Sequence, residues 1–445
     1  MGISVFDNEL YKYNYSADEM NKIFDDKNLL QKWLDVEAAL AAAEAKVGLV
    51  PDDVAAIIKE KAKVENIDME IIKKQAIITG HPFMPLLRAF TPICGAAGEY
   101  VHLGTTTQDM MDTAEILQIR EGYELILKQL KELYEELLKK AEEKKKTIIM
   151  GRTNGQHALP ITVGFKFAVW ASETKRHIQR LESCKDRLFV GQFSGAVGSL
   201  ASLGENAIQV RKFFFEELNL NSPDITWNTS RDNVVEIASI LGIMASTLSK
   251  IGNEVYALQK QEFSEFEEFT GHGAVGSSTM PHKKNPFISM QIVSLGRLVK
   301  IAVAEAFETL ENEHERDPRS LSVEWDYVPR VFCFASAALE KTINLVSNLV
   351  IKEKNINKNI NILQGLVFSE KIMMKLSSSI GRQTAHDLMH ELALEALENG
   401  TPLKDMIIGN KEIMEHFTKE EVEESLKAEN YLGLSEYFVD EVLAR

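Results

Sequence analysis

The chain has 445 residues, of which 45% are hydrophobic and 26% are charged, and its formal net charge is −16. This composition is typical of a soluble globular protein, and the length predicts two or three domains. The acidic balance argues against a nucleic-acid partner, because binding to phosphates requires a basic face.

The N-terminal segment and the cysteines indicate the compartment. The segment MGISVFDNELYKYNYS contains no apolar signal core, and the chain contains no run of about 18 or more apolar residues. Cys94, Cys184 and Cys333 are too far apart for a disulfide framework or a zinc site. The chain also lacks a P-loop, an HExxH motif and a GxGxxG after a strand. We therefore expect a cytoplasmic protein with no membrane span, no metal and no cofactor.

The N-terminal part predicts a small helical domain over residues 1–109. The segment Ser16-Ala-Asp-Glu19 has the pattern of a capping box and is predicted to open a helix. An Ala-rich periodic segment from Leu29 to Val47 predicts a second helix, which Gly48 and Pro51 would stop. The Gly- and Thr-rich turn 104–109 is expected to close the domain.

From Asp112 onward the pattern predicts long helices. Apolar residues recur every three or four positions, and no proline interrupts residues 112–159, so the first of these helices should run to roughly 50 Å. The members of this stripe are Ile116, Ile119, Tyr123, Ile126, Leu130, Leu133 and Leu137. Further helices are predicted over about 161–190 and 231–268, from Pro286 toward Glu311, and over 330–350.

These elements predict an all-α fold of three helical domains. Helices of this length bury their stripes in bundles, and several stripes are apolar on more than one side. We therefore expect a central long-helix bundle over 110–353 that is shared between subunits. Residues 354–445 are predicted to form a small C-terminal helical domain.

Residues 271–286 (GHGAVGSSTMPHKKNP) interrupt the helical pattern. A segment of this length without structure of its own is usually functional, although its composition also suits a plain linker. Its serine pair, Lys283 and Asn285 suit the binding of a carboxylate beside a nucleophile or base. Two shorter polar turns, 105–108 and 151–157, also offer hydroxyls and amides; either alone is more often a helix cap, but three such loops together favour a site.

The three segments together resemble the fumarase/aspartase superfamily. Residues 276–286 (GSSTMPHKKNP) are similar to its signature loop, and residues 101–109 (VHLGTTTQD) and 151–157 (GRTNGQH) are similar to its two other site regions, in the expected order. The resemblance covers essentially the whole chain. It is strongest to the branch that holds adenylosuccinate lyase and 3-carboxy-cis,cis-muconate cycloisomerase.

The resemblance implies a homotetramer in which three subunits build each site, and an elimination across a succinyl-type Cα–Cβ pair that commonly releases fumarate. By position Ser277 corresponds to the catalytic base. The resemblance also implies residues that bind the substrate carboxylate and stabilise it as it gains negative charge. The substrate-binding residues expected on these grounds are Thr106, Thr107, Thr153, Asn154, Gln156, Ser278, Met280, Lys283 and Asn285.

One departure from the family pattern concerns the general acid. Many members carry a His after the Arg-Thr of the second region and a Glu past the Asn-Pro of the third, where this chain has Asn154 and Met290. A departing amine or alkoxide needs an acid, whereas a leaving group that is stable as an anion does not. We therefore expect such a leaving group, or an acid drawn from His81, His102 or His157; each of these histidines could equally be structural.

A second departure concerns a nucleotide phosphate. Adenylosuccinate lyases resemble one another in holding the nucleotide phosphate with two arginines. This chain has Asn14 and Trp325 at the matching positions, so the bidentate contacts to a phosphate are lost. Arg231 and Arg316 remain as candidate partners for further carboxylates, although Arg231 could instead form a structural salt bridge to Asp232 or Glu236.

The sequence therefore predicts a lyase that performs β-elimination, or the reverse addition or cycloisomerisation, on a small succinyl-type polycarboxylate. A 3-carboxy-cis,cis-muconate cycloisomerase-like enzyme is the main hypothesis. Adenylosuccinate lyase is one alternative. A structural homologue that has lost its activity is another, which the intact Ser277, Lys283 and Asn285 oppose.

Overall fold

The computed structural model describes residues 4–269, 277, 279–280 and 282–445. The chain folds into two compact units, and the boundary falls inside each of five long helices. The first unit comprises residues 1–131, 176–249 and 291–340, and the second comprises 132–175, 250–290 and 341–445. The predicted all-α class is confirmed. The predicted domain boundaries at 109/110 and 353/354 stay a prediction.

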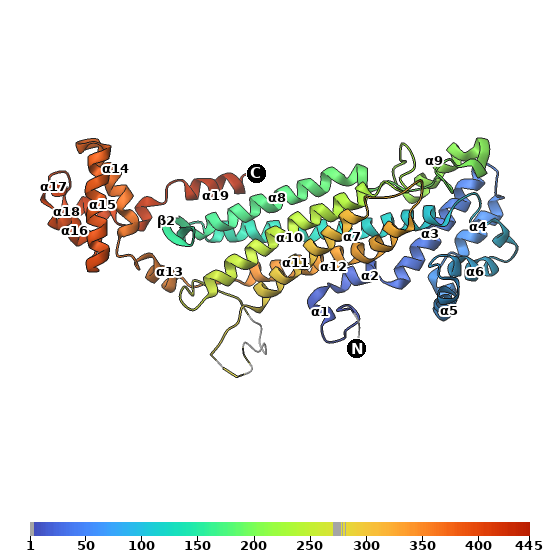
Figure 1. Cartoon of the computed structure of the whole chain (residues 1–445), viewed down its shortest axis with the longest axis horizontal. Helices are drawn as coiled ribbons and strands as arrows, with labels where there is room; N and C mark the ends of the chain where they lie inside the picture. Colours follow the sequence, from blue (N-terminus) through green and yellow to red (C-terminus); the bar gives the residue numbers. More distant parts are fainter. Residues whose placement is uncertain (1–3, 270–276, 278, 281) are drawn as a thin grey trace. The chain divides into compact units, whose positions relative to one another are not determined.

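The long helices begin and end close to the predicted places, except that α7 and α10 end earlier and α12 begins earlier than predicted. They are α7 (Thr107–Glu143), α8 (Val163–Leu188), α10 (Asp232–Gln259), α11 (Phe287–Glu308) and α12 (Pro318–Asn348) (Figure 1). The predicted stripe of α7 is buried along its whole length. α12 begins twelve residues before the predicted 330, and residues 331–339 are buried on every side. α7 ends at Glu143 because the chain then forms strands.

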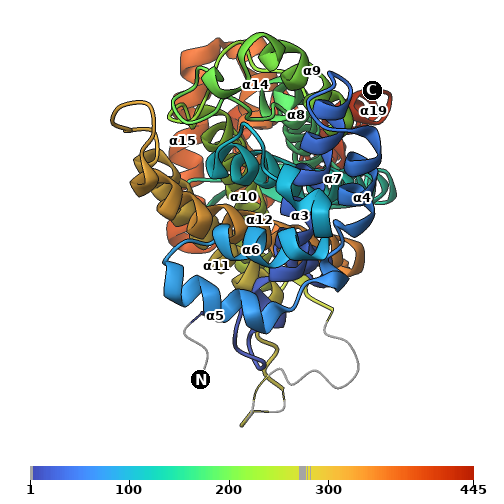
Figure 2. The ribbon, with the colours of Figure 1, turned by 90° about the vertical axis from the view of Figure 1, so that its right-hand side faces the viewer.

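The remaining elements of the first unit are short helices, of which α3 to α6 lie together in Figure 2. They are α1 (Lys12–Tyr15), α2 (Asp18–Ile23), α3 (Asp26–Ala45), α4 (Asp52–Lys61), α5 (Met69–Thr79), α6 (Met84–Ile93) and α9 (Ala207–Leu218), with 3₁₀ turns Val64–Asn66, Gly95–Tyr100 and Ala201–Asn206. The predicted capping box is wrong: Ser16 ends α1, its hydroxyl donates to the Ala17 carbonyl, and α2 has no side-chain cap. The next helix, α3, is capped: Asp25 accepts from the Asn28 amide at 2.7 Å.

The second unit contains two small antiparallel sheets and the C-terminal helices. Strand β1 (Ile148–Thr153) pairs with β2 (Gln156–Thr162), and β3 (Phe266–Glu267) pairs with β4 (Val350–Ile351). The C-terminal helices enclose an apolar core of their own, which includes Leu376, Met389 and Ile407. They are α13 (Glu353–Ile360), α14 (Ser369–Ile380), α15 (Arg382–Asn399), α16 (Leu403–Gly409), α17 (Lys411–Met414), α18 (Lys419–Ser425) and α19 (Ser435–Leu443), with 3₁₀ turns Leu366–Phe368 and Ala428–Tyr431.

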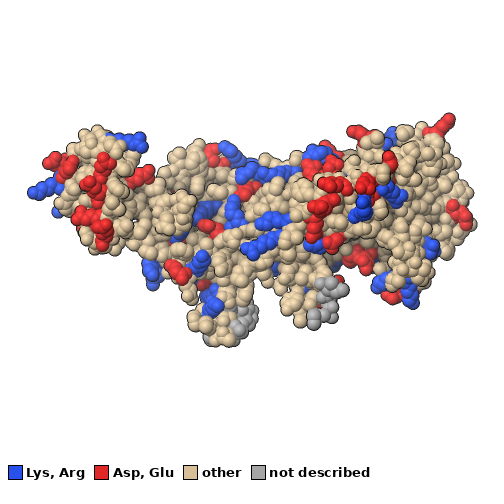
Figure 3. All heavy atoms as spheres, in the orientation of Figure 1, with Lys and Arg blue, Asp and Glu red and all other residues tan. Residues whose placement is uncertain are grey.

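Two helices of the described chain, α10 and α11, are long and apolar enough to cross a membrane by length and composition alone. The apolar part of α10 is 72% buried inside the chain, which is the behaviour of a core helix, whereas that of α11 is only 33% buried. Ile301 and Phe307 lie on the uncovered face of α11. Both signs of charge occur across the face shown in Figure 3, without segregation into a single basic patch.

Glu44 is a buried carboxyl in the apolar interior of α3. Its side chain is fully buried, and neither of its oxygens has a hydrogen-bond partner among the described residues. Burial, and to a smaller extent the charge of Glu37, raises the pKa of Glu44 from 4.5 to about 9. The folded chain therefore holds a proton on Glu44 at neutral pH.

We expect Glu44→Gln to remove a pH dependence of stability. Because the folded pKa lies above the unfolded one, unfolding releases a proton between pH 4.5 and pH 9. Over that window this group makes the free energy of unfolding fall by about 1.4 kcal/mol per pH unit as the pH rises. Urea unfolding should be measured at pH 5, 6.5 and 8, at one protein concentration. The free energy of unfolding of the variant, relative to that of the wild type, should rise with each increase in pH. Parallel curves for the two proteins would contradict this assignment.

Candidate active site

Arg316 lies where two long helices begin. It precedes α12 by two residues, and its guanidinium donates to side chains at the start of α7: Thr106 Oγ1 at 2.7 Å, Thr107 Oγ1 at 3.2 Å and Gln108 Oε1 at 2.9 Å. Among the described residues, none of its hydrogen-bond partners is a carboxylate, and the side chain is exposed. Its positive charge, together with the positive ends of two helix dipoles, makes this place suitable for an anion.

Asp109 holds the turn that presents these threonines. Its buried carboxylate accepts from the Thr105 hydroxyl at 3.2 Å and from the backbone amides of Thr106 at 3.2 Å, Ser194 at 3.0 Å and Gly195 at 2.9 Å. Burial raises the pKa of Asp109, although these hydrogen bonds act in the opposite direction. The carboxylate therefore fixes the turn and leaves the Thr106 and Thr107 hydroxyls to Arg316.

The surroundings of His81 favour an uncharged ring that can donate a hydrogen bond. Its Nδ1 accepts from the backbone amides of Phe83 at 3.1 Å and Met84 at 3.3 Å, so the neutral ring carries its proton on Nε2. Burial, and next the charge of Arg316, lowers the pKa of His81. At neutral pH the ring is uncharged, and its Nε2–H is available as a hydrogen-bond donor near Arg316.

His102 is held by a buried carboxylate. Its Nδ1 lies 2.6 Å from Oε1 of Glu37, and its ring packs against Phe83 at 5.7 Å between centroids. The residue has φ +66°, an uncommon conformation for a side chain other than glycine. Such a conformation costs free energy, so the contact with Glu37 and the packing on Phe83 must hold the ring in place.

The segment 151–157 forms the tip of a β-hairpin that lies between α7 and α8. Asn154 has φ +52° and Gly155 has φ +79°, as the two central residues of a type I′ turn require. Thr153, Asn154 and Gln156 are exposed at this tip. The predicted ligands of this region are therefore presented together on a defined turn.

An ion pair fixes the hairpin close to its turn. Arg152 donates to the buried Glu265 through Nη1 at 2.9 Å and Nη2 at 2.6 Å, and Asn359 donates to the same carboxylate at 2.8 Å. His157 lies opposite Arg152 in the sheet, and its buried Nδ1 has no partner among the described residues. Burial, and next the charge of Arg152, lowers the pKa of His157, so this ring is neutral at pH 7.

Ser277 is held in a tight turn of its own. Its Oγ accepts from the backbone amide of Met280 at 3.1 Å and lies 3.4 Å from the Thr279 amide. Donors aimed at a hydroxyl oxygen favour its anionic form, which is the form that a serine base requires. Ser278, predicted as a substrate ligand, and residues 271–276 and 281 of the signature loop lie outside the described residues.

The end of this loop lines a cavity of about 650 Å³ in the second unit. Three of the predicted ligands, Met280, Lys283 and Asn285, contribute to its wall, and their role in binding stays a prediction. Lys284 and Lys352 also line it and both bind Glu267, Lys284 at 2.6 Å. Lys283 has no carboxylate partner among the described residues, so its charge is available to a bound anion.

Arg231 is a structural cation, and its predicted partners are wrong. It is 1% exposed and binds Asp112 through Nη1 at 2.9 Å and Glu324 through Nε at 3.1 Å, with Glu115 at 3.7 Å. Glu236 instead pairs with Arg187. Burial and the engaged guanidinium oppose the predicted contact with substrate.

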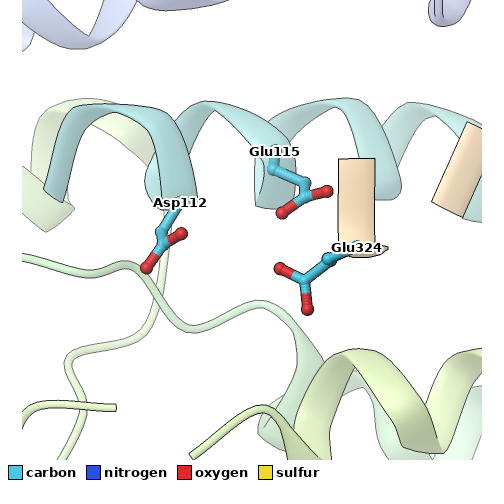
Figure 4. Close-up of side chains that lie close together, drawn as sticks. All are labelled: Asp112, Glu115 and Glu324. Atoms are coloured by element: carbon cyan, nitrogen blue, oxygen red, sulfur yellow. The ribbon is translucent and has the colours of Figure 1, made fainter. Parts of the chain in front are cut away.

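Figure 4 shows the three carboxylates of this cluster, with Glu115 of α7 and Glu324 of α12 pointing toward one another. One carboxylate oxygen from each of the three residues lies within 4.8 Å of the others, a spacing that could suit a metal ion. Arg231 already lies among them as the counter-cation, so the donor set does not fit a resident metal.

Comparisons with known proteins identify the family. A family model described as "Lyase" matches residues 11–297, and one described as "Adenylosuccinate lyase C-terminus" matches residues 365–442. The chain belongs to the fumarase/aspartase superfamily of lyases.

Three relatives illustrate the range of this superfamily. The chain is 40% identical to N-acetyl-S-(2-succino)cysteine lyase of Enterococcus italicus, over 100% of this chain and 98% of that protein. It is 40% identical to adenylosuccinate lyase of Methanocaldococcus jannaschii, over 97% and 94%. The crystal structure of 3-carboxy-cis,cis-muconate lactonizing enzyme from Pseudomonas putida superposes with a TM-score of 0.94 at 34% identity, over 98% of each chain. The predicted superfamily lyase, an enzyme of the β-elimination and cycloisomerisation class, is confirmed at family level.

The sequence pointed to the turns of this lyase but missed the residues that hold them. Asp109, Glu265 and Asn359 are not among the predicted site residues, yet they fix the threonine turn and the hairpin. One signal was present: Asp109 follows Thr106 by three residues at a helix start, the spacing of a capping side chain. Lys352 lies far along the chain from the loop, and no local pattern indicates it.

Proposed function

We propose that this lyase cleaves the C–S bond of an S-(2-succino) thioether by β-elimination, releasing fumarate and a thiol. One observation carries the proposal: Asn154 and Met290 stand where many superfamily members carry a His and a Glu, so neither position supplies an acid to the leaving group. A thiolate leaves without protonation far more readily than an amine, because a thiol ordinarily has a pKa of about 8.5. The relative from Enterococcus italicus bears the name of such a substrate.

The residues support the following chemistry. Ser277 Oγ removes the proton from the carbon beside one carboxylate, and Lys283, Asn285, Thr153 and a Thr106 or Thr107 hydroxyl stabilise the charge that builds up on that carboxylate. The electron pair then forms the carbon–carbon double bond as the C–S bond breaks, and both electrons of that bond leave with sulfur. Arg316 binds the second carboxylate, and the neutral His81 donates a hydrogen bond to a group near it.

The same proposal includes a cytoplasmic homotetramer whose subunits share each site. The uncovered apolar face of α11 around Ile301 and Phe307 supports an interface, because exposed apolar patches mark contact surfaces. The predicted ligands Thr153, Asn154 and Gln156 are exposed at the hairpin tip, where a neighbouring subunit could use them.

Adenylosuccinate cleavage is the second candidate, favoured by the 40% identity to the Methanocaldococcus jannaschii enzyme. Against it, Asn14 accepts a hydrogen bond from Gln291 at 3.1 Å, and Trp325 lines an apolar cavity. Neither position supplies a guanidinium for a phosphate.

The direct test is an assay for fumarate or lactone with purified protein. We expect S-(2-succino)-N-acetylcysteine to be cleaved with a kcat/KM at least tenfold above that for adenylosuccinate or 3-carboxy-cis,cis-muconate. Ser277→Ala serves as the control for contaminating activity. Preferred cleavage of adenylosuccinate, or lactone formation alone, would overturn the proposal, and no activity on any of the three would favour a protein that has lost its activity.

Asn154→His should not accelerate cleavage of the thioether. Histidine tolerates positive φ better than most residues, so the hairpin tip should keep its shape. If the thiolate leaves unaided, a new acid at this position has no proton transfer to assist, and kcat should stay within about twofold of wild type. Steady-state kinetics of Asn154→His beside Asn154→Ala test this. A selective rise for the histidine variant would show that the leaving group needs an acid.

A further inference from the structure

A second cavity, of about 220 Å³, lies in the first unit and belongs to none of the predicted site segments. Phe24, Trp33, Met111 and Trp325 line it with apolar and aromatic surface, and its polar groups come from Glu115 and Gln118. An engineered apolar cavity of about 150 Å³ holds a benzene molecule. This one is therefore large enough for one ring or a short branched chain.

Two helices connect this cavity to Arg316 and the threonines that it contacts. On α7, Thr107, Met111 and Glu115 are spaced four residues apart and so lie along one face of the helix. At 1.5 Å per residue, Met111 lies about 6 Å and Glu115 about 12 Å along the helix axis from the threonine that binds Arg316. α12 begins just after Arg316 and brings Trp325 to the cavity about two turns further on. Pro82, next to His81, also lines it.

The charge behind the cavity wall disfavours an anionic ligand. Asp112, Glu115 and Glu324 share the single guanidinium of Arg231, which is turned into the protein and engaged by Asp112 and Glu324. Glu115 is the member of this cluster that lines the cavity. A phosphate placed here would be desolvated beside carboxylates that outnumber their counter-cation, whereas an uncharged group that donates and accepts hydrogen bonds suits a protonated Glu115. Burial, and next the charge of Glu324, raises the pKa of Glu115, which favours its protonated form.

We infer that this cavity binds an uncharged group of the leaving thiol, acyl or alkyl, and rejects a phosphorylated one. The inference rests on the proposed thioether cleavage and specifies the class of thiol that is released. With the succinyl carboxylate at Arg316, the sulfur substituent would extend along α7 toward Met111 and Trp325. Trp325 thereby becomes a specificity-determining residue.

Three S-(2-succino) adducts that differ only at the end of a two-carbon thiol test the inference: those of N-acetylcysteamine, cysteamine and 2-mercaptoethyl phosphate. Their tails are neutral, cationic and anionic. We expect kcat/KM for the neutral adduct to exceed the values for both charged adducts by about tenfold or more. Trp325→Arg should shift the ratio of neutral to phosphorylated adduct by about tenfold toward the phosphate. Val323→Ala, exposed on the same helix and outside the cavity wall, is the matched control and should change nothing.

Calorimetric binding of the three adducts to Ser277→Ala separates this inference from the proposed function. If wild type cleaves all three adducts alike and binding shows no order, the cavity inference is wrong while thioether cleavage stands. If nothing is cleaved but the neutral adduct still binds about tenfold more tightly, and Trp325→Arg removes most of that difference, the cavity inference stands and the proposed reaction is wrong. Preference for the cationic adduct would overturn the inference in favour of an ammonium site built on the aromatic residues.

Discussion

Ser277→Ala should lower kcat by about a thousandfold or more, with a change in KM of only a few fold. The hydroxyl oxygen is the only atom of this side chain that can take a proton, and a methyl group cannot replace it. The Met280 and Thr279 amides that point at Oγ would stabilise an alkoxide and have no such role toward alanine. Lys283 and Asn285 remain, so the carboxylate should still bind. Fumarate release measured under saturating substrate, with calorimetric binding of the same substrate, gives both quantities.

The neighbouring hydroxyl provides a matched control for this prediction. Thr279 lies in the same turn and contributes its backbone amide rather than its side chain to Ser277. Thr279→Ala should therefore keep most of the activity. Equal losses in the two variants would indicate that the turn, and not the Ser277 oxygen, was damaged. Substantial residual turnover in Ser277→Ala would assign the base to another group.

The long helices were predictable because their apolar stripes repeat with the helical period. Every member of the α7 stripe from Ile116 to Leu137 is buried, as the spacing indicated. The polar turn at 151–157 was predicted, but the short strands that flank it in the hairpin at 148–162 were missed. Its decisive signal was the pair Asn154-Gly155, since both residues need positive φ, and this local requirement overrides the propensity of the flanking segments.

The partners of site residues were harder to predict than the site turns. The partners of Arg231 lie 119 residues away at Asp112 and 93 residues away at Glu324. A single sequence shows only which residues are close along the chain, so Asp232 and Glu236 were predicted as the salt-bridge partners of Arg231. The same limit applies to Glu265, which fixes Arg152 from 113 residues away. Turn chemistry is encoded locally, whereas the carboxylates that hold a turn depend on which helices pack together.

Arg231→Met should destabilise the fold strongly, by about 3–5 kcal/mol in the free energy of unfolding. Methionine fills much of the volume, but it leaves Asp112, Glu115 and Glu324 buried together without a counter-cation. Loss of the guanidinium then raises the pKa of Asp112, which burial already raises to about 6 in the wild type, and that of Glu115, which burial also raises. Urea unfolding at pH 7 measures the loss. The free energy of unfolding of Arg231→Lys should lie between those of the wild type and Arg231→Met, since lysine restores the charge without the bidentate contacts.

The pH dependence of this variant distinguishes lost charge compensation from lost packing. A carboxyl whose folded pKa is raised stabilises the folded state less as the pH rises above its unfolded pKa. The stability deficit of Arg231→Met should therefore shrink on going from pH 8 to pH 5, as the carboxyls take up protons. Adding Asp112→Asn and Glu324→Gln to Arg231→Met should recover part of the loss at pH 8, because neutral amides need no counter-cation. A deficit that is the same at both pH values, and that the amides leave unchanged, would mean that Arg231 stabilises the bundle by its packing and its stacking on Trp227 rather than by its charge.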